Sequence, residues 1–454
     1  MLMQVSCLRL GLHRGGRRLW LQGLRLAAAG YRPGVRYTLI ADAVSKALTL
    51  RICEGERVVS RKQVGASVYP VIDLDGVERV LGDGERVQGT YAEQTIYIVP
   101  HPQELAADER GRRLLRKLGR GEALSFGSLS HGGGILDHAV HEGFVGAGVP
   151  AWLAWACDRE AAYLQASLER NPVWSDRTLL VQAEMEDIDP VVLPRIEVLV
   201  AGLPCTGASL AGRAKNRLRC AEEHESAGTP VLAFLAVIQR CQPAVILLEN
   251  VVAYQSTASM ALIRASLARW GYVVHEHVVG ADLGALEDRD RLCVIAVTRG
   301  FELVWSPRPL RSAEACLGDV LEPIGPDDEA WRRCEYLDAK EDRDRAAGKG
   351  FRTQLVTPAS TRIGTIGRGY AKWRSTEPMV AHPDREGWRR LLTPREHAGV
   401  KSVPPALVEG LGATLAHEIL GQSVLHAPWM AVASMLAMQL RTWASSAGQT
   451  AAAV

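Results

Sequence analysis

Three apolar runs in the middle of the chain stop or start abruptly at residues that carry chemistry. The first ends at Pro204-Cys205, the second runs directly into Glu249, and the third begins immediately after Arg291. Uninterrupted apolar runs of this length predict strands buried on both faces of a parallel sheet. Because strand ends line the ligand crevice of open α/β sheets, we expect a thiol, a carboxylate and guanidinium groups to meet in one cleft.

The length and spacing of the apolar runs change along the chain and predict its domain organisation. Short β-like runs with glycine turns come first, then strands alternating with helical stretches, which is typical of a doubly wound, mostly parallel α/β sheet. An irregular, arginine-rich stretch follows, and helical signals then return. The expected parts are a small β-rich accessory domain over 1–118, an α/β domain over 119–300, the arginine-rich segment over 301–388, a return to the α/β domain over 389–442, and a flexible tail over 443–454.

The first region is predicted to form small β structure, with strands over 37–40, 48–52, 57–59 and 95–99. Through Trp20-Leu21 and residues 29–35 it resembles AbrB-like and SymE-like swapped-hairpin barrels. That resemblance implies a DNA-binding or dimerising domain, because a swapped barrel needs two chains to close its core. An accessory domain of another role is an equal alternative.

Composition and charge are those of an ordinary globular protein. The chain has 454 residues, 47% of them hydrophobic, and a net charge of +2. The nine cysteines contain no C-x-x-C pair, which argues against a disulfide framework or a thiolate zinc site and favours a reducing cytoplasm. No stretch is long and apolar enough for a membrane helix, so no membrane is expected. His138 and His141 have helical spacing without a third ligand, so no metal is expected either.

The first forty residues contain arginines and no acid, a bias that an organellar transit peptide would share. The packed-looking run around Trp20, closed by the turn near Gly30, favours a folded element instead. The arginines of this stretch have no acid near them in the sequence, so we expect affinity for phosphate. They are Arg9, Arg14, Arg17, Arg18 and Arg25.

A glycine-bearing segment opens the α/β region at residues 124–134 and is expected to bring backbone N–H groups close to a ligand. The next apolar run ends at Asp158, where a carboxylate can bind ribose hydroxyls. A further acid, Asp187, follows the next helical stretch. Together these features predict an adenosine pocket.

In their order and spacing, these residues resemble the cytosine-5 DNA methyltransferase family over roughly residues 120–430. The elements that carry the resemblance are Phe126 with the glycines after it, Asp158, Asp187, Pro204-Cys205, Glu249-Asn250-Val251, Arg289-x-Arg291, residues 392–396 and Gly421-Gln422-Ser423-Val424.

The resemblance implies a covalent mechanism. Cys205 adds to carbon 6 of cytosine, Glu249 protonates or shares a proton with ring nitrogen 3, Arg291 holds the base carbonyl and the carboxyl, and Arg289 fixes the nearby backbone. The methyl group comes from S-adenosylmethionine, which leaves as S-adenosylhomocysteine. The cytosine must be flipped out of double-stranded DNA, since neither face of a stacked base is open to the thiol.

The same resemblance names the binding residues and makes 301–388 the target-recognition domain. The cofactor residues are Phe126, Gly127, Ser128, Leu129, Asp158, Asp187, Pro204, Gln422 and Ser423. The DNA residues are Thr206, Ser209, Arg362, Arg368, Lys372 and Arg374.

Several positions depart from the family pattern. Thr206 replaces the usual Gln after Pro-Cys, Glu287 replaces the Gln before the arginine pair, and Gln422 replaces an Asn. Ser128 and Ser130 stand where glycines are common. These changes indicate a divergent subfamily with an intact reactive trio.

Three functions remain open from the sequence. The favoured one is a DNA methyltransferase of a modification or phage-type system in the bacterial cytoplasm. A tRNA-methylating relative is the second, although the large recognition segment argues against it. A catalytically silent DNA-binding relative is the third, and the intact Cys205, Glu249 and Arg291 argue against that.

Overall fold

The computed structural model describes residues 3–204, 229–310, 315–348 and 352–452. The chain divides into two compact units, Met1–Glu109 and Arg110–Val454. The boundary between them falls inside one helix, α3 (Pro102–Arg120), rather than after residue 118.

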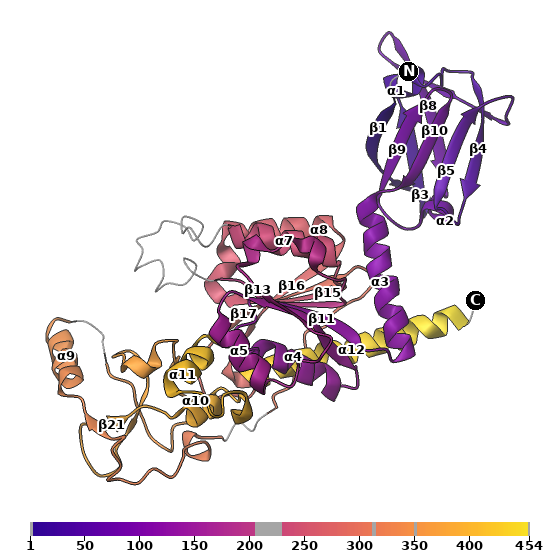
Figure 1. Ribbon diagram of the computed structural model, residues 1–454. Helices are drawn as coiled ribbons and strands as arrows, with labels where there is room; N and C mark the ends of the chain where they lie inside the picture. The colour runs from indigo at the N-terminus through magenta and orange to yellow at the C-terminus, as the bar shows by residue number, and fades with distance from the viewer. Residues whose placement is uncertain (1–2, 205–228, 311–314, 349–351, 453–454) are drawn as a thin grey trace. The chain divides into compact units, whose positions relative to one another are not determined.

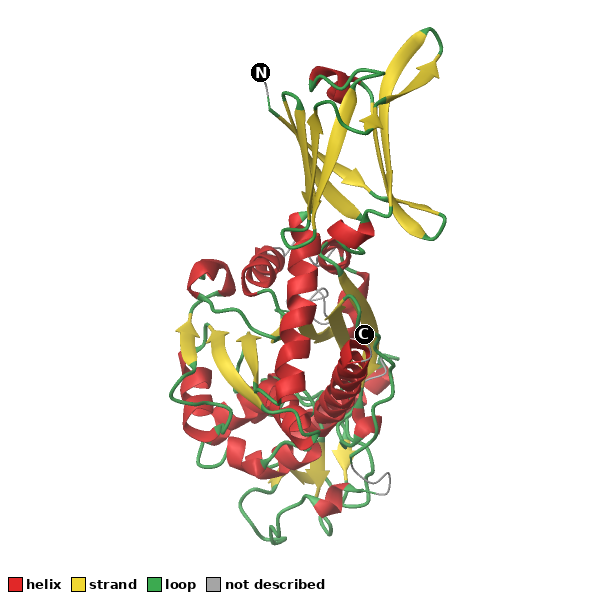
Figure 2. Cartoon of the chain, turned by 90° about the vertical axis from the view of Figure 1, so that its right-hand side faces the viewer, coloured by secondary structure: helices red, strands yellow, loops and turns green. Residues whose placement is uncertain are grey.

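The first unit consists of two antiparallel sheets (Figures 1 and 2). The strand order is β1-β9-β10-β5-β4-β6 in one and β2-β3-β8-β7 in the other. The four strands expected from the sequence are present as β4, β5, β6 and β10. The strands are β1 (Gln4–Arg9), β2 (Gly11–His13), β3 (Gly16–Gln22), β4 (Arg36–Asp42), β5 (Ala47–Ile52), β6 (Arg57–Val58), β7 (Ser60–Val64), β8 (Ser67–Asp75), β9 (Arg86–Ala92) and β10 (Thr95–Pro100), with the short helices α1 (Leu24–Ala28) and α2 (Glu78–Leu81) between them.

A single chain closes the core of this unit. Leu19 and Leu21 from one sheet and Leu50 and Ile96 from the other belong to the same buried cluster. The homodimer expected from the swapped-hairpin resemblance rested on a core shared by two chains, and this structure gives it no support.

Two of the N-terminal arginines have acidic partners, contrary to the expectation from the sequence. Arg18 is ion-paired with Asp73, and Arg17 lies 3.9 Å from a carboxylate oxygen of Glu85. These acids are far away in the sequence but are brought close by the antiparallel pairing of β3 with β8 and by the chain that follows it.

The second unit is built on a seven-stranded sheet of order β13-β12-β11-β14-β15-β17-β16. β17 runs antiparallel to both its neighbours, whereas the pairs on the other side of β15 are all parallel. The predicted α/β fold with a mostly parallel sheet is confirmed. The strands are β11 (Leu124–Leu129), β12 (Ala151–Asp158), β13 (Leu179–Gln182), β14 (Val198–Gly202), β15 (Val245–Val251), β16 (Tyr272–Val279) and β17 (Arg291–Thr298).

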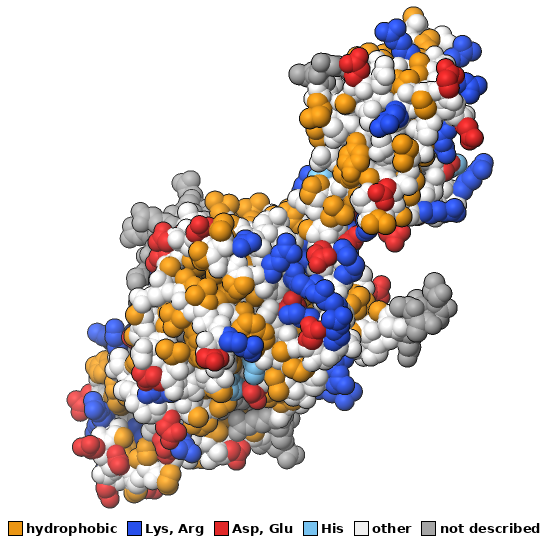
Figure 3. All heavy atoms as spheres, turned by 45° about the vertical axis from the view of Figure 1, so that its right-hand side comes forward, with side chains coloured by type: hydrophobic (Ala, Val, Ile, Leu, Met, Phe, Trp, Pro, Cys, Tyr) orange, Lys and Arg blue, Asp and Glu red, His pale blue; other side chains and the backbone are white. Residues whose placement is uncertain are grey.

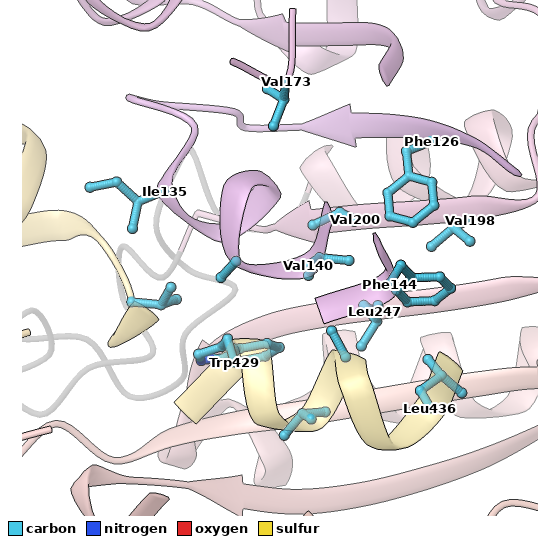
Figure 4. Packing of buried hydrophobic residues seen from close by; sticks show 14 of the residues in the cluster. Phe126, Ile135, Val140, Phe144, Val173, Val198, Val200, Leu247, Trp429 and Leu436 are labelled. Atoms are coloured by element: carbon cyan, nitrogen blue, oxygen red, sulfur yellow. The ribbon is translucent and has the colours of Figure 1, made fainter. Parts of the chain in front are cut away.

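Helices cover both faces of this sheet. α7 (Thr229–Cys241) and α8 (Ala258–Arg269) bury one face, and α4 (Ile135–Gly146), α5 (Ala161–Arg170) and α12 (His426–Ala452) bury the other. Figure 4 shows Phe144 and Trp429 in the second of these cores. α4 and α12 approach closely at Gly143, where a Cβ atom would lie 2.6 Å from that of Ala433.

The arginine-rich segment has its own small core and a four-stranded sheet of order β18-β21-β20-β19. These strands have two or three residues each: β18 (Arg332–Arg333), β19 (Leu355–Val356), β20 (Met379–Ala381) and β21 (Trp388–Arg390), and the helix α9 (Glu335–Ala346) follows β18. α10 (Pro394–Val400) then begins with a capping box between Thr393 and Glu396, and α11 (Ala413–Gln422) leads to α12.

In the described part of the chain, no single helix is long and apolar enough to cross a membrane. Ala413–Gln422 and His426–Gly448 meet the length and composition criterion only together, as a bent pair.

Candidate active site

Two of the reactive residues expected from the sequence, Glu249 and Arg291, lie at one end of the central strands of the seven-stranded sheet. Gly202, at the end of β14, pairs in register with Glu249 on β15, and Val251 pairs with Arg291 at the start of β17. A Cβ atom on Gly202 would lie 3.6 Å from a carboxylate oxygen of Glu249. The antiparallel direction of β17 is what places its first residue beside the last residues of β15.

Glu249 and Arg291 form an ion pair at this end of the strands. The Nε of Arg291 lies 3.0 Å from Oε1 of Glu249, and each side chain is 17% exposed. Burial raises the pKa of Glu249, against the opposing effect of Arg291 and Arg289. A carboxyl group with a raised pKa holds a proton more readily, which suits a group that donates one to a substrate.

Arg289 is buried and acts on the backbone. Its guanidinium donates hydrogen bonds to the carbonyl of Ile366 at 3.2 Å and to that of Gly421 at 2.9 Å. It also lies 3.3 Å from Glu287. Arg289 therefore joins three segments that are far apart in the sequence, while Arg291 is the arginine that contacts Glu249.

The expected nucleophile, Cys205, and the expected DNA contacts Thr206 and Ser209 lie outside the described residues. The chain leading to them is held in place at the site. Asn250, the residue after Glu249, is buried and donates a hydrogen bond from Nδ2 to the carbonyl of Leu203 at 3.2 Å. Pro204, the last described residue before Cys205, is half-buried.

The glycine turn begins later than the sequence suggested. Gly127, Ser128 and Leu129 are buried residues of β11, and Phe126 packs edge to face against Phe144 with ring centroids 5.0 Å apart. Phe126 is therefore part of the hydrophobic core, and its expected contact with adenine stays a prediction. Gly127 is needed for packing, since a Cβ atom there would lie 2.3 Å from the ring of Trp155.

The actual turn spans residues 130–134. Ser130, Gly132 and Gly134 have positive φ angles of 57°, 56° and 72°. His131 fixes this turn, because its ring lies 2.9 Å from Asp137 and 2.8 Å from Ser167. This polar cluster could not be predicted from the sequence, since its members are brought together only by the packing of α4 and α5.

Asp158 lies at the end of β12, next to this turn. Its two carboxylate oxygens accept hydrogen bonds from the backbone N–H of Gly132 at 2.7 Å and of Glu160 at 2.9 Å. Each oxygen keeps a second acceptor position, so the carboxylate can still receive ribose hydroxyls.

Asp187 is exposed in the 3-10 helix η1 (Met185–Asp187). Glu184 comes sooner after β13 and is ion-paired with Arg159 at 3.3 Å. The strand-end rule applied to Asp158 points to Glu184 as a further candidate acid beside Asp187, and that rule could have identified it from the sequence.

The last two expected cofactor residues lie at the end of α11. Gln422 is exposed, and Ser423 donates a hydrogen bond to the carbonyl of Leu420 at 2.8 Å. α11 also packs on the glycine turn, since a Cβ atom on Gly133 would lie 2.4 Å from the side chain of Ile419. Both residues therefore belong to the helix that covers the turn.

The expected DNA contacts in the recognition segment differ in their surroundings. Arg362 is ion-paired with Asp282 and Asp288, so its charge is already balanced. Arg368 is half-exposed, 4.0 Å from a carboxylate oxygen of Glu418. Lys372 and Arg374 are exposed.

Comparison with known protein families decides the identity. The model of the C-5 cytosine-specific DNA methylase family matches residues 153–436. The chain belongs to this family.

Individual relatives within the family are distant. The chain is 28% identical over 254 residues to the Type II methyltransferase M.NlaX of Neisseria lactamica, covering 54% of this chain and 77% of that protein. It is 26% identical over 257 residues to the Type II methyltransferase M.SsoII of Shigella sonnei, covering 53% of this chain and 64% of that one.

Two solved structures have the same fold. The S. pombe Dnmt2 methyltransferase is similar with a TM-score of 0.55 and 18% identity, covering 70% of this chain and 99% of that one. The Entamoeba histolytica methyltransferase EhMeth is similar with a TM-score of 0.55 and 15% identity, covering 70% of this chain and 98% of that one. The region matched by the family model begins within β12 and therefore contains the strands of the seven-stranded sheet other than β11.

Proposed function

We propose that this family member transfers a methyl group from S-adenosylmethionine to carbon 5 of cytosine in double-stranded DNA. The observation that carries the proposal is the ion pair between Glu249 and Arg291, set in register beside the end of the strand that leads to Pro204 and Cys205. Carboxyl, guanidinium and thiol are the three groups that addition to a cytosine ring requires.

In the proposed reaction, the thiolate of Cys205 adds to carbon 6 of the flipped cytosine. Glu249 donates a proton to ring nitrogen 3 as charge develops there, and its raised pKa supports this role. Arg291 orients Glu249 and binds the carbonyl oxygen of the base. Once carbon 5 carries the methyl group, a solvent base takes the carbon 5 proton and the bond between carbon 6 and the Cys205 sulfur breaks. Glu249 then takes back the proton from ring nitrogen 3, which restores the enzyme.

The residues around the glycine turn are suited to hold the cofactor. Asp158 has free acceptor positions for ribose hydroxyls, and Glu184 is a second carboxylate at the neighbouring strand end. When bound, S-adenosylmethionine supplies the electrophilic methyl group. The polar cluster around His131 keeps the turn in its left-handed conformations, which Ser130 would not readily adopt alone.

DNA is proposed to contact the recognition segment, which extends the domain division expected from the sequence. Lys372 and Arg374 are exposed and Arg368 is half-exposed, so these three are suited to bind phosphates, whereas Arg362 would first have to leave two carboxylates. Because the named relatives are Type II methyltransferases, we further propose a role in a bacterial restriction-modification system.

The first unit is proposed to be an accessory DNA-contacting domain. Arg9, Arg14 and Arg25 are exposed on it, which supports non-specific affinity for phosphates. The ion pairs of Arg17 and Arg18 reduce the number of cations that contribute.

The test is covalent trapping combined with bisulfite sequencing. DNA from cells that express the protein should carry 5-methylcytosine at a fixed sequence context, and Cys205→Ala should abolish it. The purified protein should form a lasting adduct with DNA containing 5-fluorocytosine in that context, because fluorine does not leave as a proton does. Methylation or adduct formation by Cys205→Ala would refute the proposal.

A further inference from the structure

A fully buried ion pair joins the loop that carries Arg289 and Arg291 to the residue that follows α10. Nζ of Lys401, the residue after α10, is 2.8 Å from Oε2 of Glu287, and both side chains are 0% exposed. Glu287 is the position where the family pattern has a neutral Gln. The departure from that pattern thus introduces a buried negative charge, and Lys401 supplies the opposite charge.

Glu287 and its neighbours form hydrogen bonds with the recognition segment. Oε1 of Glu287 accepts a hydrogen bond from the backbone N–H of Ile366 at 3.1 Å. Further backbone bonds run beside it, from Asp288 to the carbonyl of Ile363 at 2.8 Å and from Ile363 to that of Leu286 at 3.0 Å. Residues 363–366 are therefore attached to the loop that carries Arg289 and Arg291.

The same loop also contacts the end of α10, next to Lys401. The backbone N–H groups of Leu286 and Glu287 both donate to the carbonyl of Val400, at 2.9 and 3.2 Å. Arg289, between the pair and the active site, donates to the carbonyls of Ile366 and Gly421. Three segments meet at this single pair of charges.

We propose that the Glu287–Lys401 ion pair is a positioning device, which fixes residues 363–366 against the arginine loop and so sets how productively DNA is held. The proposal rests on the proposed function, because DNA is the substrate it concerns. Among the described residues, neither Glu287 nor Lys401 forms a hydrogen bond or ion pair with Glu249 or with the glycine turn, although the charge of Lys401 opposes the rise in the pKa of Glu249. The pair should affect DNA use more than cofactor affinity.

Loss of either charge is expected to be more damaging than loss of both, because the remaining charge would be buried without a counter-ion. Other charged and titratable groups around Lys401 are Arg289, Arg291, Glu249, His397 and His417. Burial and the neighbouring Arg289 lower the pKa of Lys401 to about 7. As the pH rises through that value, Lys401 loses its charge and Glu287 loses its counter-ion.

The experiment compares Glu287→Gln, Lys401→Gln and the double variant, in the full chain, by steady-state methyl transfer to DNA of the identified context. Each single variant should lower kcat/KM for DNA by roughly 10²-fold, as a displacement of about 1 Å does, while the Kd for S-adenosylmethionine stays constant. The neutral pair in the double variant should recover most of the loss. The ratio of wild-type to double-variant activity should also fall as the pH rises through about 7.

Glu197→Gln is the matched control. Glu197 is also a buried acid, ion-paired with Arg113 at 2.9 Å and Lys117 at 2.7 Å, but it precedes β14 and so lies at the opposite end of the strands from the active site. This variant should lower the melting temperature and leave KM for DNA unchanged.

Unimpaired single variants would overturn the proposal, and so would a double variant that loses as much as the singles combined. If the single variants do not fold, a folded and active double variant supports the pairing, and an unfolded one refutes it. Failure of the proposed function is distinguishable, because it would appear as absent methylation by the wild-type protein.

Discussion

At the residue scale, the raised pKa of Glu249 leads to a direct prediction. Glu249→Gln keeps the shape of the side chain but removes the proton that it donates, so methyl transfer should fall roughly 10²–10⁴-fold. DNA affinity and cofactor affinity should survive, because Gln can still accept a hydrogen bond from Arg291. Single-turnover methyl transfer and calorimetry measure the two effects separately. Joint loss of both affinities would instead assign Glu249 a structural role.

The candidate reactive residues could each be named from the sequence because each stands at one end of an apolar run. Lys401 was not predictable, because no local pattern links it to Glu287, and only the fold brings them to 2.8 Å. Phe126 was assigned to the cofactor site through the family resemblance, in which it stands before the glycine turn. In the structure Gly127 instead makes room for the ring of Trp155, and the strand continues to Leu129.

At the scale of elements, the backbone of α11 packs so closely against the recognition segment that no side chain fits between them. A Cβ atom on Gly421 would lie 2.3 Å from the carbonyl oxygen of Gly367, so Gly421→Ala must push the two backbones apart. We expect a loss of about 1–3 kcal/mol in the free energy of unfolding and a higher KM for DNA. Gly146→Ala, where no atom lies within 4 Å, is the control that thermal unfolding and kinetics should leave intact. Equal behaviour of the two variants would contradict this account.

Long buried strands could be predicted from the sequence, whereas their direction could not. The apolar run of β17 resembles those of the parallel strands in the same sheet, although β17 is antiparallel to both strands beside it. The sheet of the recognition segment was missed entirely, because strands of two or three residues carry no measurable alternation. Where such short strands form is determined only by their pairing in the folded chain.

At the scale of the whole molecule, the position of α3 determines where the chain can be shortened. A protein that began at residue 119, the domain start expected from the sequence, would lack Arg113 and Lys117 and leave the buried Glu197 without a counter-ion. We expect residues 102–454 to fold and methylate, and residues 119–454 to lose about 3–5 kcal/mol of stability. Thermal unfolding and methylation assays compare the two. Equal stability of the two would show that these ion pairs contribute little. A lower DNA affinity of residues 102–454 than of the full chain at low salt would reveal the contribution of the first unit.

The packing of α12 on α4 has a consequence for the order of events during synthesis. Ser434 of α12 donates a hydrogen bond to the carbonyl of Gly143 of α4, 291 residues earlier in the chain, and Trp429 and Leu436 complete the core between them. While the ribosome is still making the intervening residues, the face of the sheet that α4 and α5 cover lacks the packing of α12, although the first unit can already fold. A nascent chain that stalls before α12 therefore exposes the apolar side chains that α12 covers in the finished protein. Such chains should be bound by chaperones, and full-length product should depend on the speed of translation through the last part of the message.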